Sequence, residues 1–413
     1  MTSPDDRLAI FDHRRGWQMG VMGAFAVVML IAIVIIGAVI EIADTELTSI
    51  SVDFYIFWAA AKLALQGLPL DAFDVARLQE VAGVTEDEWM PWAYPPGFLM
   101  LMMPFGLLPF AAAWAAFNAA GAGALLAALR PFAGGRPHVL LAAALAPAML
   151  PCLLVGQTTL LWLAGLIGAL AALRAGRPVL AGVLIGCLTL KPQLGLLLPV
   201  ALVACGAWRA ILAATVTAAL LALVPTALFG TAYWPEMLAM MKHHGEIVRG
   251  AIGHLKLMIS PYSALAALGL PEALAFALQW LLTALMALAV FITWRRPGAG
   301  FDLRAALLLT AIPLASPYLW HYESAFLAPA ALFMLRAGVL SARPASLALG
   351  VAMWLGLGPL ALVMVQVGSM DAFRQWFVPL ALLAFAACMR HVLRQPGVRH
   401  PPDPEIDNLQ EKA

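Results

Sequence analysis

Long apolar stretches separated by short polar breaks recur along the whole chain. A transmembrane helix needs about 20 mostly apolar residues to cross the hydrocarbon core. The pattern therefore predicts an all-α polytopic membrane protein. We expect twelve spans near 19–42, 110–130, 138–155, 157–174, 178–191, 193–208, 209–229, 271–294, 303–316, 322–337, 344–366 and 374–393. The first run exceeds the roughly 7–15 apolar residues of a signal peptide, so we expect it to remain as a helix.

Lysines and arginines indicate which ends of these spans face the cytosol, because cytosolic loops are enriched in them. With a cytosolic N-terminus, 17 of the 24 basic residues fall inside. The other seven are Lys62, Arg77, Lys191, Lys242, Arg249, Lys256 and Arg374. This asymmetry predicts that both termini are cytosolic: segment 1–18 at the start, and a polar tail, 395–413, that we expect to be disordered.

Two apolar segments are predicted not to cross the membrane as plain helices. Residues 97–109 lie between prolines and reach only about 20 Å as a helix, which favours a re-entrant or interfacial position. Residues 178–208 contain Lys191-Pro192 at their centre. Because a mid-bilayer lysine costs about 2.5–3.5 kcal/mol and proline breaks the helical hydrogen-bond ladder, we predict two short helices that meet at an outward-facing cavity.

Three outer segments exceed the length of a tight turn: 43–96, 230–262 and 316–324. The first is expected to form short amphipathic helices, because its apolar residues recur at helical spacing. The remaining chain over 19–394 forms a single transmembrane domain in this interpretation. No separate soluble domain is indicated.

Composition supports the membrane assignment and narrows the chemistry. The chain is 63% hydrophobic and 11% charged, whereas soluble domains are nearer one quarter charged. A formal net charge of +1 gives no indication of a nucleic-acid partner. Walker, GxSxG and HExxH motifs are missing from the sequence. The histidines in HHGEIVRGAIGHLK lack the i, i+4 spacing of a helical zinc motif, so we expect neither a metal nor another cofactor.

Three polar residues near predicted membrane boundaries are candidates for chemistry, since ionisable groups there are usually functional. Asp53 precedes the apolar run FYIFWAAAKLAL and is either a helix N-cap or a catalytic base. Lys191 is either a snorkelling or locally paired lysine or a ligand for phosphate. His321, in SPYLWHYES, is either an interfacial histidine or a donor to a phosphate or sugar.

Further outer residues have equally open interpretations. Arg249, His254 and Lys256 belong to a solvated loop face or contact an anionic headgroup. Gln157 caps its helix or lines the predicted cavity. Tyr94, in YPP, either belongs to a proline-rich loop without a binding role or forms part of a wall for a lipid or sugar. The second interpretation is open because aromatic residues favour both interfaces and carbohydrate faces.

Four motifs in order, DFYIFWAAAKLALQG, AYPPGFLMLMMPFGLLP, VGQTTLLWLAGLIGALAALRAGRPVLAGVLIGCLTLKPQ and SPYLWHYES, resemble the GT-C glycosyltransferases of family 87. That family includes polyprenyl-phosphate-mannose-dependent α-1,2-mannosyltransferases of bacteria. The resemblance spans about residues 45–335. It implies a GT-C fold in the bacterial inner membrane and a periplasmic site. It also implies a polyprenyl-phosphate sugar donor, with mannose favoured, and a glycolipid or glycan acceptor.

The resemblance also implies roles for individual residues. Asp53 matches the catalytic aspartate of the first outer loop, which would act as base in an inverting transfer. Lys191 and His321, aided by Arg249, His254 and Lys256, would bind the donor phosphate. The expected substrate cavity comprises Tyr55, Trp58, Tyr94, Gln157, Tyr318 and Glu323. Many relatives carry a tyrosine shortly after the aspartate, where this chain has Phe57 and Trp58. A lipid-linked saccharide flippase or other transporter remains the alternative.

Overall fold

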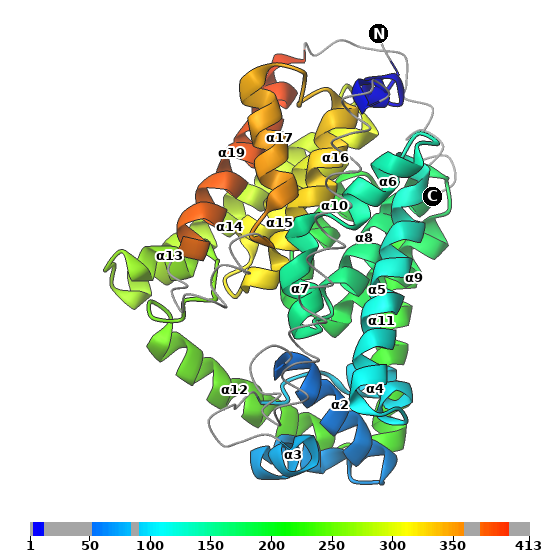
Figure 1. Ribbon diagram of the computed structural model, residues 1–413, viewed down its shortest axis with the longest axis vertical. Helices are drawn as coiled ribbons and strands as arrows, with labels where there is room; N and C mark the ends of the chain where they lie inside the picture. The colour runs from blue at the N-terminus through cyan, green and yellow to red at the C-terminus, as the bar shows by residue number, and fades with distance from the viewer. Residues whose placement is uncertain (1–2, 12–51, 84–90, 359–371, 396–413) are drawn as a thin grey trace.

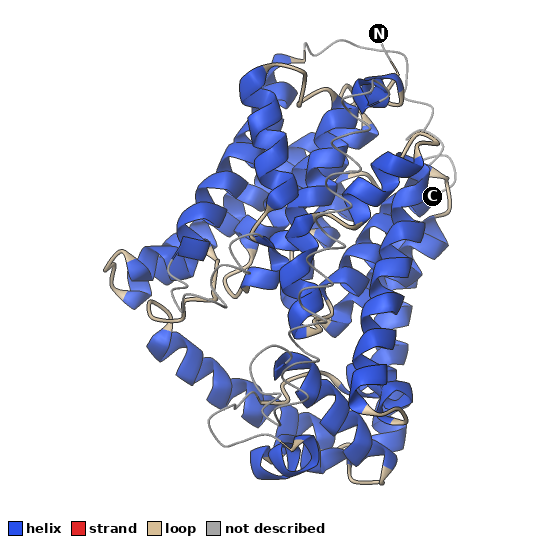
Figure 2. Cartoon of the chain, in the orientation of Figure 1, coloured by secondary structure: helices blue, strands red, loops and turns tan. Residues whose placement is uncertain are grey.

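The computed structural model describes residues 3–11, 52–83, 91–358 and 372–395. Within these residues the architecture consists of helices and loops without a β-sheet, as Figure 2 shows. One isolated antiparallel bridge joins Met258 and Trp320. The predicted span 19–42 and almost all of the tail 395–413 lie outside the described residues.

The helices follow one another closely along the chain (Figure 1). The α-helices before the Lys191 break are α2 (Val52–Leu65), α3 (Val75–Ala82), α4 (Pro96–Gly106), α5 (Phe110–Leu129), α6 (Pro137–Ala144), α7 (Leu150–Val155), α8 (Thr159–Arg174) and α9 (Pro178–Cys187). Those after it are α10 (Leu198–Ala204), α11 (Trp208–Phe229), α12 (Tyr233–Ala251), α13 (Pro261–Ala267), α14 (Glu272–Arg295), α15 (Phe301–Ala315), α16 (Leu327–Ala337), α17 (Pro344–Leu355) and α19 (Ala372–Arg394). Short 3-10 helices are η1 (Asp6–Phe11), η2 (Pro69–Phe73), η3 (Arg130–Phe132), η4 (Pro147–Met149), η5 (Leu188–Leu190), η6 (Pro192–Gly195) and η7 (His321–Phe326).

Five helical segments of the described chain are long and apolar enough to cross a membrane. They are Phe110–Phe132, Pro137–Val155, Trp208–Phe229, Glu272–Arg295 and Phe373–Arg394. The other spans predicted within the described ranges coincide with shorter or interrupted helices, so twelve spans are not confirmed. The predicted span 138–155 is interrupted where α6 ends and the chain enters η4 at Pro147. These segments nevertheless identify a membrane protein.

The long helices differ in which surroundings they face. In α11, large apolar side chains such as Leu212, Leu223 and Leu228 point outward. Such a surface is favourable in lipid and costly in water. Helix α15 is instead buried along its whole length. The bundle is therefore built around α15, and α11 lies at its lipid-facing edge.

Two hydrophobic clusters make up most of the interior. The larger, here called the bundle core, draws on α5–α10, α14–α17 and α19. The smaller, here called the α2 core, joins α2, α3, α4 and α12 at the end of the molecule opposite η1 (Figure 1). Helix α5 contributes Phe117 to the α2 core and Leu125 to the bundle core.

One prediction about the outer segments needs correction. Helix α2 was expected to be amphipathic, yet its residues from Asp53 to Ala64 are buried except for the half-buried Lys62. Its small and aromatic side chains pack on several neighbours, because the α2 core surrounds it. Segment 230–262, expected to be an outer segment between spans, contains the 19-residue helix α12, which is not among the helices apolar enough to cross a membrane.

Close packing of α9 against α11 fixes the chain just before the predicted break. A Cβ atom on Gly182 would lie 2.3 Å from the Ala210 carbonyl oxygen, and one on Gly186 would lie 2.5 Å from Thr217 Cβ. Small residues thus let the two backbones approach, as is usual between membrane helices. Lys191 follows four residues after the end of α9.

Candidate functional site

Asp53 lies in the first turn of α2 and is only 8% exposed. Its Oδ2 accepts a hydrogen bond from Gln157 Nε2 at 2.6 Å. The Gln157 Oε1 accepts from the Thr158 backbone N–H at 3.1 Å, which orients the amide so that its NH₂ group points at Asp53. Because Val52 is already helical, the carboxylate does not sit at the N-cap position. It is held instead by a side chain from the bundle.

Gly156 lets the turn after α7 pack closely against α2. Gly156 closes α7 with φ of +68°, a left-handed conformation that side chains disfavour. A Cβ atom there would lie 2.6 Å from Phe54 Cβ. The residue before Gln157 therefore has to be glycine for Asp53 and Gln157 to meet.

Burial raises the pKa of Asp53 to about 6, and the Gln157 hydrogen bond and the Lys191 charge act in the opposite direction. A carboxylate with this pKa is ionised at neutral pH yet is a stronger base than an ordinary aspartate. The environment is therefore suited to accepting a proton.

Lys191 occupies the predicted break between two short helical segments. The chain leaves η5 at Leu190 and enters η6 at Pro192, with Lys191 at φ −136° and ψ 73°. The Lys191 ammonium donates to Glu323 Oε1 at 2.5 Å, and the Trp320 backbone N–H donates to Glu323 Oε2 at 2.5 Å. The ammonium also lies 4.6 Å from the centre of the Tyr322 ring. The break is confirmed, and the lysine is paired in a largely buried position.

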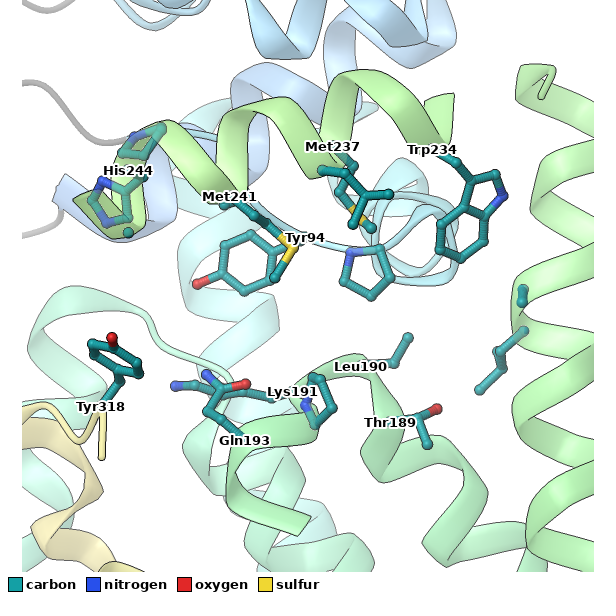
Figure 3. Close-up of a pocket in the computed structure, with 18 of the residues that line it drawn as sticks. Tyr94, Thr189, Leu190, Lys191, Gln193, Trp234, Met237, Met241, His244 and Tyr318 are labelled. Atoms are coloured by element: carbon teal, nitrogen blue, oxygen red, sulfur yellow. The ribbon is translucent and has the colours of Figure 1, made fainter. Parts of the chain in front are cut away.

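A cavity of about 860 Å³ opens in front of Lys191. Figure 3 shows Trp234, Met237 and Met241 of α12 facing Lys191 and Gln193 across it. Aromatic rings line much of the wall, from Tyr94, Trp234, Tyr318, Trp320 and Tyr322. Such a lining offers flat apolar faces together with hydroxyl and indole groups, the combination that suits a sugar or the head of a lipid.

Asp53 does not itself line the cavity, but it lies near two tyrosines that do. The charge of Asp53 acts on both Tyr94 and Tyr322, and the charge of Lys191 acts on Asp53. The carboxylate and the cation thus come from α2 and the Lys191 break, two parts of the chain that meet where the α2 core adjoins the bundle core.

Two of the predicted cavity residues serve packing in this structure. Tyr55 stacks on Phe110 with ring centres 3.9 Å apart. Trp58 donates its indole N–H to the Leu108 carbonyl at 2.9 Å. Both are buried and neither is among the residues that line the cavity.

The predicted phosphate ligands other than Lys191 are not among the residues that line the cavity. His321 is buried, stacks on Phe373 with ring centres 5.6 Å apart, and has its pKa lowered to about 4 by burial. Arg249 is exposed and lies 3.9 Å from Glu272, although its charge reaches the cavity residue Tyr318. His254 and Lys256 are exposed on the loop after α12. The structure therefore brings only Lys191 of this group to the cavity wall.

Sequence analysis did not identify the α12 face or Gln193 as part of the cavity. The α12 face had a detectable signal, because its lining residues recur at helical spacing: Trp234, Met237, Leu238, Met241, His244, Gly245 and Val248. Gln193 directly follows the Lys191-Pro192 break, at which a cavity was predicted from the sequence. Across the described residues, no group of three His, Cys, Asp or Glu side chains is arranged to hold a metal ion.

Comparison with known proteins identifies a family. The family model described as Glycosyltransferase family 87 matches residues 92–317, which is more than half of the chain. The match includes Gln157 and Lys191 and stops just before Tyr318. No curated protein and no solved structure matches the chain.

Proposed function

The chain belongs to glycosyltransferase family 87, and from this premise we propose that it transfers a hexose, with mannose favoured, from a polyprenyl-phosphate donor to a hydroxyl group. The acceptor is a glycolipid or glycan, and the reaction takes place at the periplasmic face of a bacterial inner membrane. Both termini lie in the cytosol in this proposal. The observation that carries it is the meeting of Asp53, Gln157 and Lys191 beside one aromatic cavity.

Asp53 acts as the general base. The acceptor oxygen attacks C1 of the sugar, the bond from C1 to the phosphate oxygen breaks, and the hydroxyl proton passes to the Asp53 carboxylate. Attack opposite the leaving group inverts the configuration at C1. A positioned base contributes roughly 10²–10⁴-fold to such a step. The Gln157 amide fixes the orientation of the Asp53 carboxylate. The raised pKa of Asp53 makes this carboxylate a better proton acceptor.

Lys191 receives the departing phosphate. The leaving group gains negative charge as the C1–O bond breaks, and a preorganised cation stabilises this charge in the transition state. Lys191 is suited to this role because it reaches the cavity wall from a fixed helix break. Arg249, whose charge acts on Tyr318, assists from nearby, whereas His321, His254 and Lys256 do not line the cavity.

A transporter for lipid-linked saccharides would share the helices and the cavity. It would not need a carboxylate with a raised pKa held by an amide in a fixed orientation. The arrangement around Asp53 therefore favours the transferase.

The test uses purified protein in liposomes supplied with radiolabelled polyprenyl-phosphate-mannose and a membrane glycolipid acceptor. Asp53→Asn should abolish transfer and leave donor binding nearly intact, whereas Lys191→Ala should weaken donor binding. Glu236→Gln, which changes an exposed acid on α12, is the matched control and should behave as wild type. Normal turnover by Asp53→Asn would contradict the assignment of the base, and donor movement across the bilayer without transfer would favour the transporter.

A further inference from the structure

The cation at the cavity wall is already paired before any ligand arrives. Lys191 is 4% exposed and Glu323 is 0% exposed. The two Glu323 oxygens are both engaged, one by the Lys191 ammonium and the other by the Trp320 backbone N–H. A phosphate that enters the cavity must therefore compete with Glu323 for Lys191.

The charges around Glu323 make this competition costly. The groups that interact electrostatically with it are Lys191, Asp53 of α2, Tyr94, Cys152 of α7 and the neighbouring Tyr322. With both carboxylates ionised and the tyrosines and cysteine neutral, the lysine balances only one of two negative charges. Lys191 is also the only lysine or arginine among the described residues that line the cavity.

A donor with a phosphodiester adds one more negative charge to this cluster. Two uncompensated charges in a site shielded from water are strongly unfavourable. A buried carboxylate avoids that penalty by taking up a proton. The cluster can therefore accept the donor most easily if one carboxylate becomes neutral.

We propose that Glu323 is a positioning residue that holds Lys191 in the free protein and takes up a proton when the donor phosphate takes over the lysine. Glu323 is the carboxylate concerned because it loses its counter-ion directly when Lys191 turns to the phosphate. Asp53 keeps its Gln157 partner in either state. Neutral Glu323 retains the Trp320 N–H, which its carbonyl oxygen accepts. This inference rests on the proposed function, since it requires an anionic donor.

The consequence is that donor binding is linked to protons. Where a ligand binds together with one proton, its affinity falls as pH rises, by up to about tenfold per pH unit. Removing the Glu323 charge removes both the competition for Lys191 and the group that takes up the proton. Glu323→Gln should therefore bind the donor more tightly above neutral pH, with an affinity that changes little between pH 7 and pH 8, where Asp53 is ionised.

The experiment is calorimetric titration of the protein with a polyprenyl methyl phosphodiester, a sugar-free probe that keeps one negative charge between pH 6 and pH 8. Buffers with different ionisation enthalpies report the protons taken up. Wild type should take up close to one proton per ligand and bind more weakly as pH rises. Glu323→Gln should take up none and bind about tenfold more tightly at pH 8. Asp53→Asn should still take up a proton, although less completely at pH 8, because one of the negative charges that act on Glu323 is gone.

Each other result has a distinct meaning. Binding by wild type without proton uptake would overturn the inference and leave the proposed function standing, and this measurement needs no variant. If proton uptake persists in Glu323→Gln but disappears in Asp53→Asn, then Asp53 and not Glu323 takes up the proton, and the inference is overturned. No binding of the diester at any pH, together with no consumption of polyprenyl-phosphate-mannose, would overturn both proposals.

Discussion

Two buried ion pairs lie in different parts of the molecule, and only one of them adjoins the cavity. Arg336, at 0% exposure, donates to Asp302 Oδ1 at 2.9 Å, to Asp5 Oδ1 at 2.6 Å and to the Phe132 carbonyl at 2.9 Å. These contacts tie α15, α16, η3 and the N-terminal segment together. Lys191 has a single carboxylate partner and lines a cavity rich in aromatic rings.

The difference shows that burial of a charge does not by itself identify a functional site. Both pairs carry ionisable groups away from water, which is costly unless they are well paired. The guanidinium of Arg336 binds three oxygens in a planar fork, which holds elements in place. In the proposed mechanism, the ammonium of Lys191 exchanges its partner for a ligand. The predictions below test this division between a structural pair and an exchangeable one.

The largest effect on stability is expected at Arg336. Arg336→Met leaves Asp302 buried without its partner, so the free energy of unfolding should fall by about 3–5 kcal/mol. Thermal unfolding in detergent measures the loss. The folded fraction should still bind the polyprenyl phosphodiester with wild-type affinity. An unchanged midpoint of unfolding would mean that this pair does not hold the elements together.

At Lys191 we expect a loss of donor affinity and a smaller loss of stability. Lys191→Met should weaken binding of the phosphodiester by about 1.5–3 kcal/mol, since it removes one charged hydrogen bond to the ligand. Its effect on unfolding should be smaller than that of Arg336→Met, because Glu323 beside the cavity can become protonated. If Lys191→Met and Arg336→Met lose the same stability and Lys191→Met still binds the phosphodiester with wild-type affinity, then the Lys191 pair is structural like the Arg336 pair.

The smallest effect concerns the pH profile. Transfer requires ionised Asp53, so the rate should fall as pH drops through about 6, the raised pKa of this carboxyl. Gln157→Leu removes the hydrogen bond that lowers this pKa, so the acidic limb of the profile should move to higher pH by about one unit. Gln193→Leu, at the cavity wall, is the matched control and should leave the limb in place. A limb that stays unmoved in Gln157→Leu would mean that the amide does not stabilise the carboxylate.

Local signals in the sequence predicted the elements of the site better than their contacts. The Lys191-Pro192 dipeptide predicted the helix break, because proline cannot continue the backbone ladder. The apolar runs predicted α5, α11 and α14 to within a few residues. These features depend on residues close together in the chain, and so they could be inferred without a structure.

The contacts that define the site were not predictable in the same way. The Lys191–Glu323 pair joins residues far apart in sequence, and nothing local indicated that Glu323 would hold the lysine. Gln157 was expected to cap a helix or line the cavity, whereas it holds Asp53 through a turn that Gly156 alone permits. Segment 230–262 was expected to be an outer segment, and the face of α12 that lines the cavity was not recognised within it. Long-range packing decided each of these outcomes.

In the proposed reaction, Asp53 removes the acceptor proton while Lys191 receives the phosphate. The single-turnover rate of hexose transfer from polyprenyl-phosphate-mannose in liposomes, for wild type and Asp53→Asn between pH 5 and pH 8, tests this assignment of the base. We expect a wild-type rate that rises through pH of about 6 and a variant rate at least about 100-fold lower, with no such rise. A variant that transfers the sugar at the wild-type rate across this range would contradict the claim.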